Sequence, residues 1–122
     1  MNTDYLAFEG VDGSGKKSYI EALSSHLEKK SINFKIVREP GGSKLGEGIR
    51  ELLLSHEYTV EPLTEALLFS ANRANLVREI IKPSIKNGIK INDVFSIAKN
   101  FKKINFLGKT EKIDSQVSKV RF

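Results

Sequence analysis

The sequence contains no cysteine. Disulfide bridges, thiolate metal sites and cysteine nucleophiles are therefore excluded for these residues. The sequence also lacks any apolar run near the length of a membrane-spanning helix, and its first residues show no basic segment followed by an apolar one. We therefore expect a cytoplasmic protein with no membrane partner.

An excess of basic side chains is confined to the last part of the sequence. The net charge is +5, and residues 99–122 account for all of it, so residues 1–98 are electrically neutral as a group. Phe101, Phe106 and Phe122 lie among these lysines, and aromatic rings between cations can stack on the bases of a single-stranded nucleic acid. Composition favours the alternative, a solvated charged tail. Nucleic acid is therefore not the expected partner.

The most informative stretch that is present is rich in glycine and reads Gly10-Val11-Asp12-Gly13-Ser14-Gly15-Lys16-Lys17-Ser18. A β-prone run precedes it and an amphipathic helical pattern follows it, which is the context of a phosphate-binding loop. The glycines let backbone N–H groups turn inward, and the helix N-terminus and Lys16 add positive charge. The alternative is a turn without a ligand. Because strand and helix flank the loop correctly, we predict that this fold binds phosphate.

One position of the phosphate-loop pattern departs from expectation. The pattern G-x-x-x-x-G-K-[ST] ends in a hydroxyl that ligates Mg²⁺, but this sequence has Lys17 there. Ser18 offers a hydroxyl one position later, which is about 100° further round a helix.

The remaining pattern predicts a parallel α/β sheet. A helix over 16–30 follows the loop, a strand over 34–37 precedes a loop over 38–42, and a strand near 89–91 leads to Asp93. Two further helices are expected between these strands, at 45–55 and from Pro62 onward. Pro83 should interrupt the second of them, and Asn87-Gly88 should end it with a turn. Beyond Asp93 we expect a short helix over 94–103, a strand over 104–107 and a lysine-rich remainder.

Four ordered blocks then resemble the N-terminal half of thymidylate kinase, the P-loop enzyme that phosphorylates dTMP with ATP. They are residues 8–16, 38–43, 45–54 and 65–73. The resemblance covers residues 5 to 93 and implies a P-loop NTPase-type parallel sheet with flanking helices, incomplete relative to the family. It divides the chain into a nucleotide kinase-like core, 1–93, and a basic tail of uncertain fold, 94–122. It also leaves a homodimer open.

The resemblance implies a role for each matching residue. The loop from Gly10 to Ser18, Val11 and Ser14 included, would bind ATP, with Lys16 as its cation; Asp93 would act in catalysis near Mg²⁺. In the family the counterpart of Phe69 stacks on thymine and that of Arg73 bonds the base edge, and a spacing of four puts both on one helix face. The remaining assignments concern the acceptor dTMP. Asp12 would lie near its sugar, Arg50 would bind its phosphate, and Glu39 would shape its nucleoside pocket. Pro40 resembles a proline that is cis in some members of the family. Without the resemblance, purely structural roles would be expected for these residues: Phe69 would be part of the hydrophobic core, and Arg50 and Arg73 would be solvated on the surface.

The sequence departs from the family at three places. Lys17 replaces the magnesium-ligating Ser/Thr, Val94 stands where the family has an arginine after the aspartate of Asp93-Val94-Phe95, and residues 94–122 contain no counterpart of the arginine-bearing lid. Lid arginines in related systems accelerate phosphoryl transfer by about 10³–10⁵. An internal deletion and a frameshift both account for residues 94–122. The sequence therefore leaves two functions open, a kinase forming dTDP for dTTP biosynthesis and a non-catalytic paralogue that only binds nucleotide.

Overall fold

The computed structural model describes residues 4–10, 12–96 and 117–121. In chain order the elements are β1 (Tyr5–Gly10), α1 (Lys16–Lys29), β2 (Phe34–Glu39), α2 (Lys44–Leu54), α3 (Pro62–Leu76), the π-helical turn η1 (Val77–Ile81), α4 (Lys82–Lys86), β3 (Lys90–Ser96) and β4 (Val117–Arg121). None of the helices in these ranges has the length and apolar content needed to cross a bilayer.

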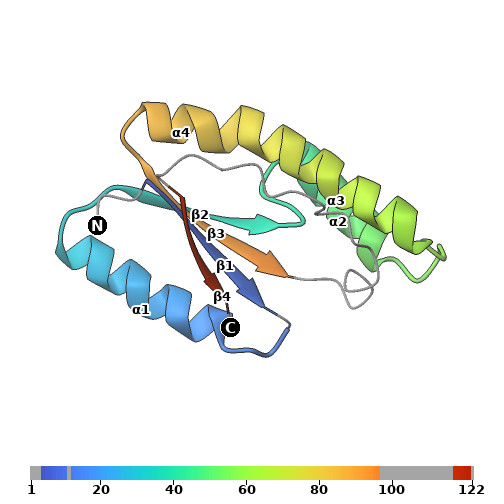
Figure 1. The fold of residues 1–122 in the computed structure, drawn as a ribbon, viewed down its shortest axis with the longest axis horizontal. Helices are drawn as coiled ribbons and strands as arrows, with labels where there is room; N and C mark the ends of the chain where they lie inside the picture. Colours follow the sequence, from blue (N-terminus) through green and yellow to red (C-terminus); the bar gives the residue numbers. More distant parts are fainter. Residues whose placement is uncertain (1–3, 11, 97–116, 122) are drawn as a thin grey trace.

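The four strands form one parallel sheet in the order β2-β3-β1-β4 (Figure 1). The β3 strand lies in the centre, with Ala7 of β1 and Val37 of β2 both opposite Asp93. Since β1 and β2 point the same way, the predicted parallel α/β sheet is confirmed. The carboxyl ends of β1 and β2 meet at one edge, where parallel sheets bind ligands.

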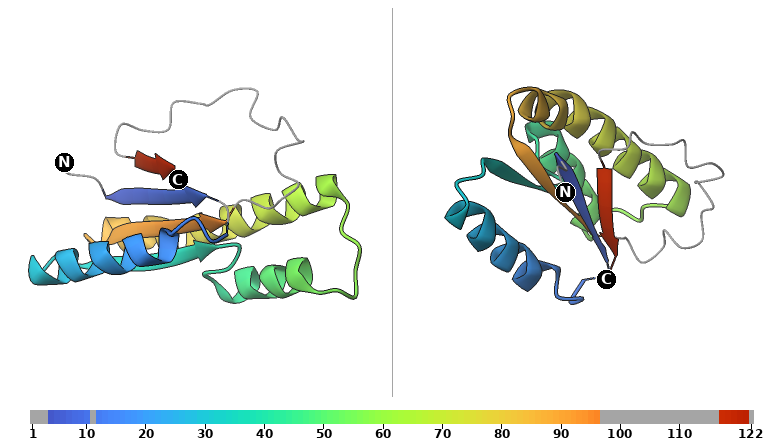
Figure 2. Two further views of the ribbon diagram at one scale, coloured as in Figure 1. Left: turned by 90° about the horizontal axis from the view of Figure 1, so that it is seen from below. Right: turned by 60° about the vertical axis from the view of Figure 1, so that its left-hand side comes forward.

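Helices cover both faces of the sheet (Figures 1 and 2), with α1 on one face and α3, η1 and α4 on the other. On the α1 face, the ring of Phe8 lies 5.5 Å from that of Tyr19. On the opposite face, strand residues and helix residues form one buried apolar cluster, which consists of Tyr5, Val37, Leu76, Ile81 and Ile91. The period-2 alternation of each strand thus supplies two separate layers of core.

The regular α-helix is interrupted just before Pro83, as predicted, but the chain stays helical through the interruption. Proline lacks the N–H that bonds four residues back, and its ring clashes with that carbonyl. The chain avoids the clash by widening one turn: η1 is π-helical, and the N–H of Lys82 bonds to the carbonyl of Val77, five residues back. Pro83 then falls in the first turn of α4, where no N–H is required. The predicted turn at Asn87-Gly88 is confirmed, with φ of 74° at Gly88.

Two expectations for the last part of the chain also need correction. Residues 94–96 belong to β3 instead of opening a helix, and residues 117–121 form a strand that pairs with β1 where only a lysine-rich tail was expected. The rest of the helix predicted over 94–103, from residue 97 onward, and the strand predicted over 104–107 lie outside the described residues. The three tail phenylalanines of the nucleic-acid hypothesis, 101, 106 and 122, do too. The division of the chain at residue 93 stays a prediction.

Candidate functional site

The predicted phosphate loop connects β1 to α1. It begins at Gly10, the last residue of β1, and Gly15 is the N-cap of α1. Gly13 and Gly15 have φ of 80° and 88°, and a Cβ at either position would meet no atom within 4 Å. The loop is therefore open above two left-handed glycines and a helix N-terminus, which suits an anion. Val11 lies outside the described residues.

The two lysines of the loop differ in environment. Lys16 is 7% exposed, and its Nζ donates to the carbonyl oxygen of Gly10 at 2.7 Å. The side chain of Lys17 is 91% exposed and lies 4.0 Å from Glu21, one turn along α1. Ser18 is also exposed. The ammonium group of Lys16 therefore lies over the loop, whereas the side chain of Lys17 extends into solvent.

A buried polar cluster lies on the α3 face of the sheet. Glu39, at the end of β2, is 1% exposed and Asp93, in β3, is 0% exposed. Arg73 of α3 approaches both carboxylates, with Nε at 2.6 Å from Oε1 and 2.7 Å from Oε2 of Glu39, and Nη2 at 3.8 Å from Oδ2 of Asp93. The hydroxyl of Tyr5 donates a hydrogen bond to Oδ2 of Asp93. Two acids thus share one guanidinium.

Burial and charge shift the pKa values in this cluster. Burial, reinforced by the neighbouring Asp93 and opposed by Arg73, raises the pKa of Glu39 from its ordinary 4.5 to about 8. Burial would lower the pKa of Arg73, but the surrounding Glu39, Tyr5 and Asp93 outweigh it and raise this pKa. Burial and the nearby Asp93 also raise the pKa of Tyr5. The cluster therefore keeps its phenol and guanidinium protonated and favours the protonated form of Glu39.

The loop after β2 is fastened to α2. The Glu39–Pro40 peptide bond is cis. The carboxylate of Glu47 accepts from the N–H of Gly42 at 2.9 Å and from Nη2 of Arg38 at 2.9 Å. Arg50, about one turn along the same helix, donates from Nη1 to the carbonyl of Pro40 at 3.1 Å. The guanidinium that was predicted to hold a phosphate is thereby fixed beside the loop that holds Glu39.

The same loop is fastened to α3 by two asparagines. Oδ1 of Asn72 accepts from the N–H of Gly41 at 3.0 Å, and Nδ2 of Asn75 donates to Oγ of Ser43 at 2.9 Å. That Oγ also caps α2 by accepting from the N–H of Gly46 at 3.0 Å. Asn72 is 0% exposed, and its Oδ1 is satisfied by this bond, whereas its Nδ2 has no partner among the described residues. The loop and α3 therefore form one connected unit.

Close approach of the loop to α2 gives a testable prediction. A Cβ at Gly46 would lie 2.5 Å from both Oδ1 of Asn72 and the carbonyl oxygen of Gly41, whereas a Cβ at Gly48 would meet nothing within 4 Å. We expect Gly46→Ala to lower the free energy of unfolding by about 1–3 kcal/mol through overpacking. Gly48→Ala, in the same helix, should raise it by up to about 1 kcal/mol. Urea titration of both variants measures this, and a stabilised Gly46→Ala would contradict the close packing.

Comparison with known proteins agrees with this geometry. A sequence model of the family described as thymidylate kinase matches residues 8–93. The chain belongs to the thymidylate kinase family. The thymidylate kinase of Fervidobacterium nodosum is 50% identical over 93 residues, which are 75% of this chain and 46% of that protein. The thymidylate kinase of Kosmotoga olearia is 49% identical over 82 residues, 67% of this chain and 39% of that protein.

A solved structure has the same fold. The crystal structure of thymidylate kinase from Ehrlichia chaffeensis matches with a TM-score of 0.68 and 34% sequence identity, over 80% of this chain and 53% of that one. The chain thus spans less than half the length of the two curated relatives and about half of the solved one. What the family membership shows is therefore the identity of the matched part, a thymidylate kinase fold of the P-loop type.

The structure brings some of the predicted site residues together. Arg73, Glu39 and Asp93 are in one cluster, and Arg50 contacts the residue after Glu39. Phe69 lies one turn before Arg73 on α3 and is 7% exposed, so little of its ring is open in this state. Asp12 is exposed on the phosphate loop. The roles of all these residues in binding stay predictions.

The described residues suit a magnesium ion that is bound jointly by the protein and a nucleotide. They suit an ion held by protein side chains alone less well. No group of three or more His, Asp or Glu side chains able to hold a metal occurs in the described ranges. Oδ1 of Asp93 is buried and accepts no hydrogen bond from any described residue. Mg²⁺ commonly takes one or two carboxylates together with waters and substrate phosphates. Asp93 suits that arrangement, and the exposed Lys17 adds no ligand to it.

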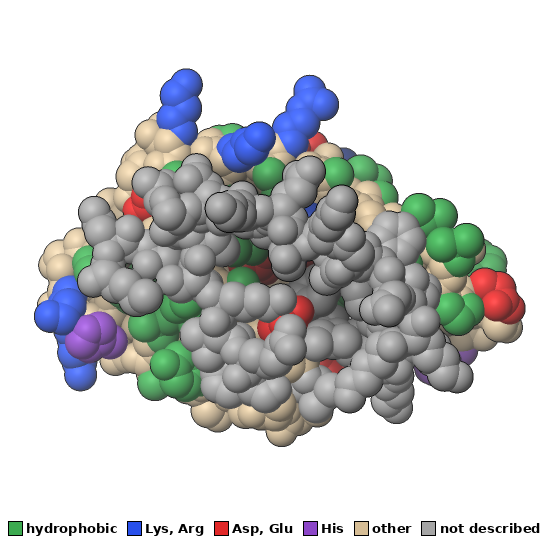
Figure 3. All heavy atoms as spheres, viewed as in Figure 1, with side chains coloured by type: hydrophobic (Ala, Val, Ile, Leu, Met, Phe, Trp, Pro, Cys, Tyr) green, Lys and Arg blue, Asp and Glu red, His purple; other side chains and the backbone are tan. Residues whose placement is uncertain are grey.

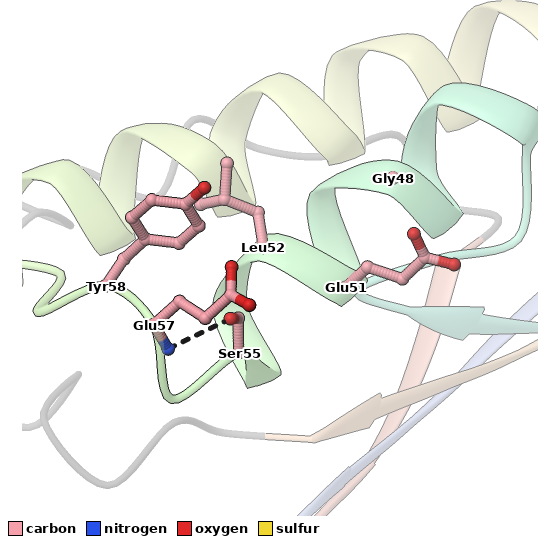
Figure 4. Close-up of a pocket in the computed structure, with 6 residues that line it drawn as sticks. All are labelled: Gly48, Glu51, Leu52, Ser55, Glu57 and Tyr58. Carbon is pink, nitrogen blue, oxygen red and sulfur yellow. Dashed lines mark hydrogen bonds between the residues drawn. The ribbon is translucent and has the colours of Figure 1, made fainter.

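The surface outside this site has a hollow, a group of basic side chains and a group of exposed leucines. A hollow of about 350 Å³ beside the end of α2 (Figure 4) contains none of the predicted site residues; it is lined by Gly48, Glu51, Leu52, Ser55, Glu57 and Tyr58. Basic side chains stand out over η1 and α4 in Figure 3, where Arg78, Lys82 and Lys86 are exposed. Exposed leucines mark α2 and α3, namely Leu45, Leu52, Leu54, Leu63 and Leu67. A homodimer through such a surface stays a prediction.

Proposed function

We propose that this chain carries the nucleotide sites of a dTMP kinase, which transfers the γ-phosphoryl group of ATP to the phosphate of dTMP and so serves dTTP biosynthesis. The buried Arg73–Glu39–Asp93 cluster, on a thymidylate kinase fold beside an open phosphate loop, is the observation that carries the proposal. Two fully buried carboxyl groups beside a half-buried guanidinium are costly to desolvate. Their retention at the sheet edge is explained by a polar ligand.

The geometry of these residues supports the roles that the family resemblance implies for them. Lys16, whose Nζ lies over the loop at the carbonyl of Gly10, would neutralise β- and γ-phosphate oxygens. Arg50, held at Pro40, would bind the acceptor phosphate in the bidentate way that suits a guanidinium. Arg73 is anchored by Glu39 while 42% of its side chain stays exposed, so it can meet the edge of a base. Phe69 would stack on that base after opening of its surroundings.

The reaction needs positioning and charge stabilisation more than covalent chemistry. An oxygen of the acceptor phosphate attacks the γ-phosphorus, the bond to the bridging oxygen breaks, and the leaving group is ADP. Asp12, on the loop, would lie near the acceptor sugar, and Glu39 would shape the pocket around it. Asp93 would hold Mg²⁺, which when bound neutralises charge on the transferred group. The fixed loop 40–43 limits the freedom of the acceptor and thus the entropic part of the barrier.

Calorimetric titration tests the proposal at the level of binding. Folded protein should bind dTMP, and Phe69→Ala should weaken that binding by about 1–3 kcal/mol, the scale of base stacking. Leu67→Ala, at an exposed position of the same helix, is the matched control and should leave the affinity unchanged. For ATP, Lys16→Ala should cost about 1.5–3 kcal/mol, the range of a charged hydrogen bond. Lys17→Ala should cost far less. Absence of dTMP binding by folded protein would contradict the proposal.

One observation favours a second candidate, a nucleotide-binding protein without turnover. The family's magnesium-ligating hydroxyl is replaced by Lys17, whose side chain faces solvent. An ammonium cannot ligate a cation and repels one nearby. Lys17→Thr should therefore improve Mg²⁺-dependent ATP binding without restoring full turnover, since Val94 still lacks a guanidinium. A coupled assay of ADP formation separates the candidates, and turnover of about 1–100 s⁻¹ by the unmodified chain would reject the second one.

A further inference from the structure

Tyr5 joins two environments that the sequence does not connect. It is 8% exposed, and its ring belongs to the apolar cluster between the sheet and the α3 layer, together with Val37, Leu76 and Ile91. Its hydroxyl leaves this cluster and donates to Oδ2 of Asp93. Since Tyr5 pairs with Ile91 across β1 and β3, the phenol reaches along the sheet toward Asp93. Such a tyrosine anchors its polar tip through a rigid apolar body.

The two carboxylate oxygens of Asp93 have different hydrogen-bond partners. Oδ2 accepts from the Tyr5 hydroxyl and lies 3.8 Å from Nη2 of Arg73. Oδ1 is buried and accepts no hydrogen bond within the described part of the chain. A carboxylate turns easily about its last bond, because that torsion has a broad profile. The hydrogen bond from Tyr5, together with the attraction of the Arg73 guanidinium for the same oxygen, opposes this rotation and leaves Oδ1 as the oxygen without a described donor.

We propose that Tyr5 is a positioning residue, which fixes the carboxylate of Asp93 so that Oδ1 is presented to a divalent cation carried by a nucleoside triphosphate. The inference rests on the proposed function, since it assumes that Asp93 meets such a cation. Tyr5 itself touches neither the cation nor the nucleotide. Its effect comes through the orientation of Asp93, and groups that orient a metal ligand typically change metal affinity by about 10–100-fold.

The experiment compares ATP binding with and without magnesium. Isothermal titration measures the ATP affinity in excess Mg²⁺ and again in EDTA, and the ratio of the two affinities is the magnesium gain. Tyr5→Phe removes only the hydroxyl and should reduce this gain about 10-fold or more, with the affinity in EDTA unchanged. Tyr58→Phe, at a position that is 61% exposed between α2 and α3, is the matched control and should keep the full gain.

The outcomes separate this inference from the proposed function. If the unmodified chain shows no magnesium gain, the proposed use of Mg²⁺–ATP is rejected, and the role of Tyr5 with it. If the unmodified chain shows a gain and Tyr5→Phe retains all of it, only the positioning role is overturned. An equal loss of affinity with and without Mg²⁺ overturns it too, because the hydroxyl then serves the fold. Tyr5→Leu is a second variant without the hydroxyl and should lose the gain as well; if neither variant folds, the role is rejected.

Discussion

Arg73→Ala should lower the free energy of unfolding by about 3–5 kcal/mol at pH 8, the cost of leaving a buried charge without its partner. The guanidinium lies within 2.7 Å of Glu39 and 3.8 Å of Asp93, whose side chains are both fully buried. Arg73 opposes the rise in the pKa of Glu39, so without it the charged form of Glu39 is disfavoured further and its protonated form persists to higher pH. The loss should therefore be smaller at pH 5, where that proton is readily supplied.

A second arginine of the same chain provides the control. Arg38 pairs with Glu47 at 2.9 Å, but their side chains are 56% and 44% exposed. Exposed pairs contribute about 0–1 kcal/mol because water and salt screen them, so Arg38→Ala should be nearly neutral. Denaturant titration of both variants at pH 5 and pH 8 measures the contrast. Equal losses for the two arginines, or a loss at Arg73 that is independent of pH, would contradict the account of the buried cluster.

Stability of the unmodified chain should fall as pH rises from about 5 to about 9. The pKa of Glu39 is about 8 in the folded state against an ordinary 4.5, so the folded protein holds a proton in this window that the unfolded chain has released. Stability is fully present below the unfolded pKa and is lost as pH rises through the folded one. One pKa unit corresponds to about 1.4 kcal/mol, so the expected decline is roughly 3–5 kcal/mol.

Glu39→Gln tests this assignment because its amide does not titrate but can still accept from Arg73. The variant should show a much flatter dependence on pH and become the more stable protein at the alkaline end. Glu47→Gln is the control: the bond from the Gly42 N–H and the contact with Arg38 lower the pKa of Glu47, so its titration lies below this window. A decline that persists unchanged in Glu39→Gln would show that another group causes it.

The elements that could be predicted are those specified by local pattern. The glycine-rich loop, the strands near 5–9 and 34–37, and the helix that starts at Pro62 follow from alternation, helical spacing and turn residues, and the structure has them at these positions. The interruption of the α-helix before Pro83 was also predicted, but the local rule for proline gave no sign that one widened turn would keep the chain helical there. The strand over 117–121 has no clear alternation, and its partner β1 lies at the other end of the sequence.

The candidate site also has a part that local pattern predicts and a part that it does not. The phosphate loop is visible because its chemistry is contiguous, whereas Arg73, Glu39 and Asp93 became candidates only through the family resemblance. Their contact depends on α3 packing over β2 and β3, which no local pattern encodes. Tyr5 was read only as part of a strand, since a tyrosine in a β-prone run gives no hint that its hydroxyl meets an aspartate. Asn72, a buried polar residue on an apolar helix face, was the one available signal for the fastening of loop 40–43.

The pairing of β4 with β1 has a consequence for synthesis on the ribosome. Because Tyr5 lies opposite Val117, the outer edge of β1 has no partner strand until about a hundred further residues have been made. At roughly 5–20 residues per second that takes about 5–20 seconds. During this time the nascent chain presents an open parallel edge, with N–H and C=O groups that other strands can pair with. Until β4 has been made, this edge of β1 is therefore a part of the described sheet that is open to pairing with a strand of another chain.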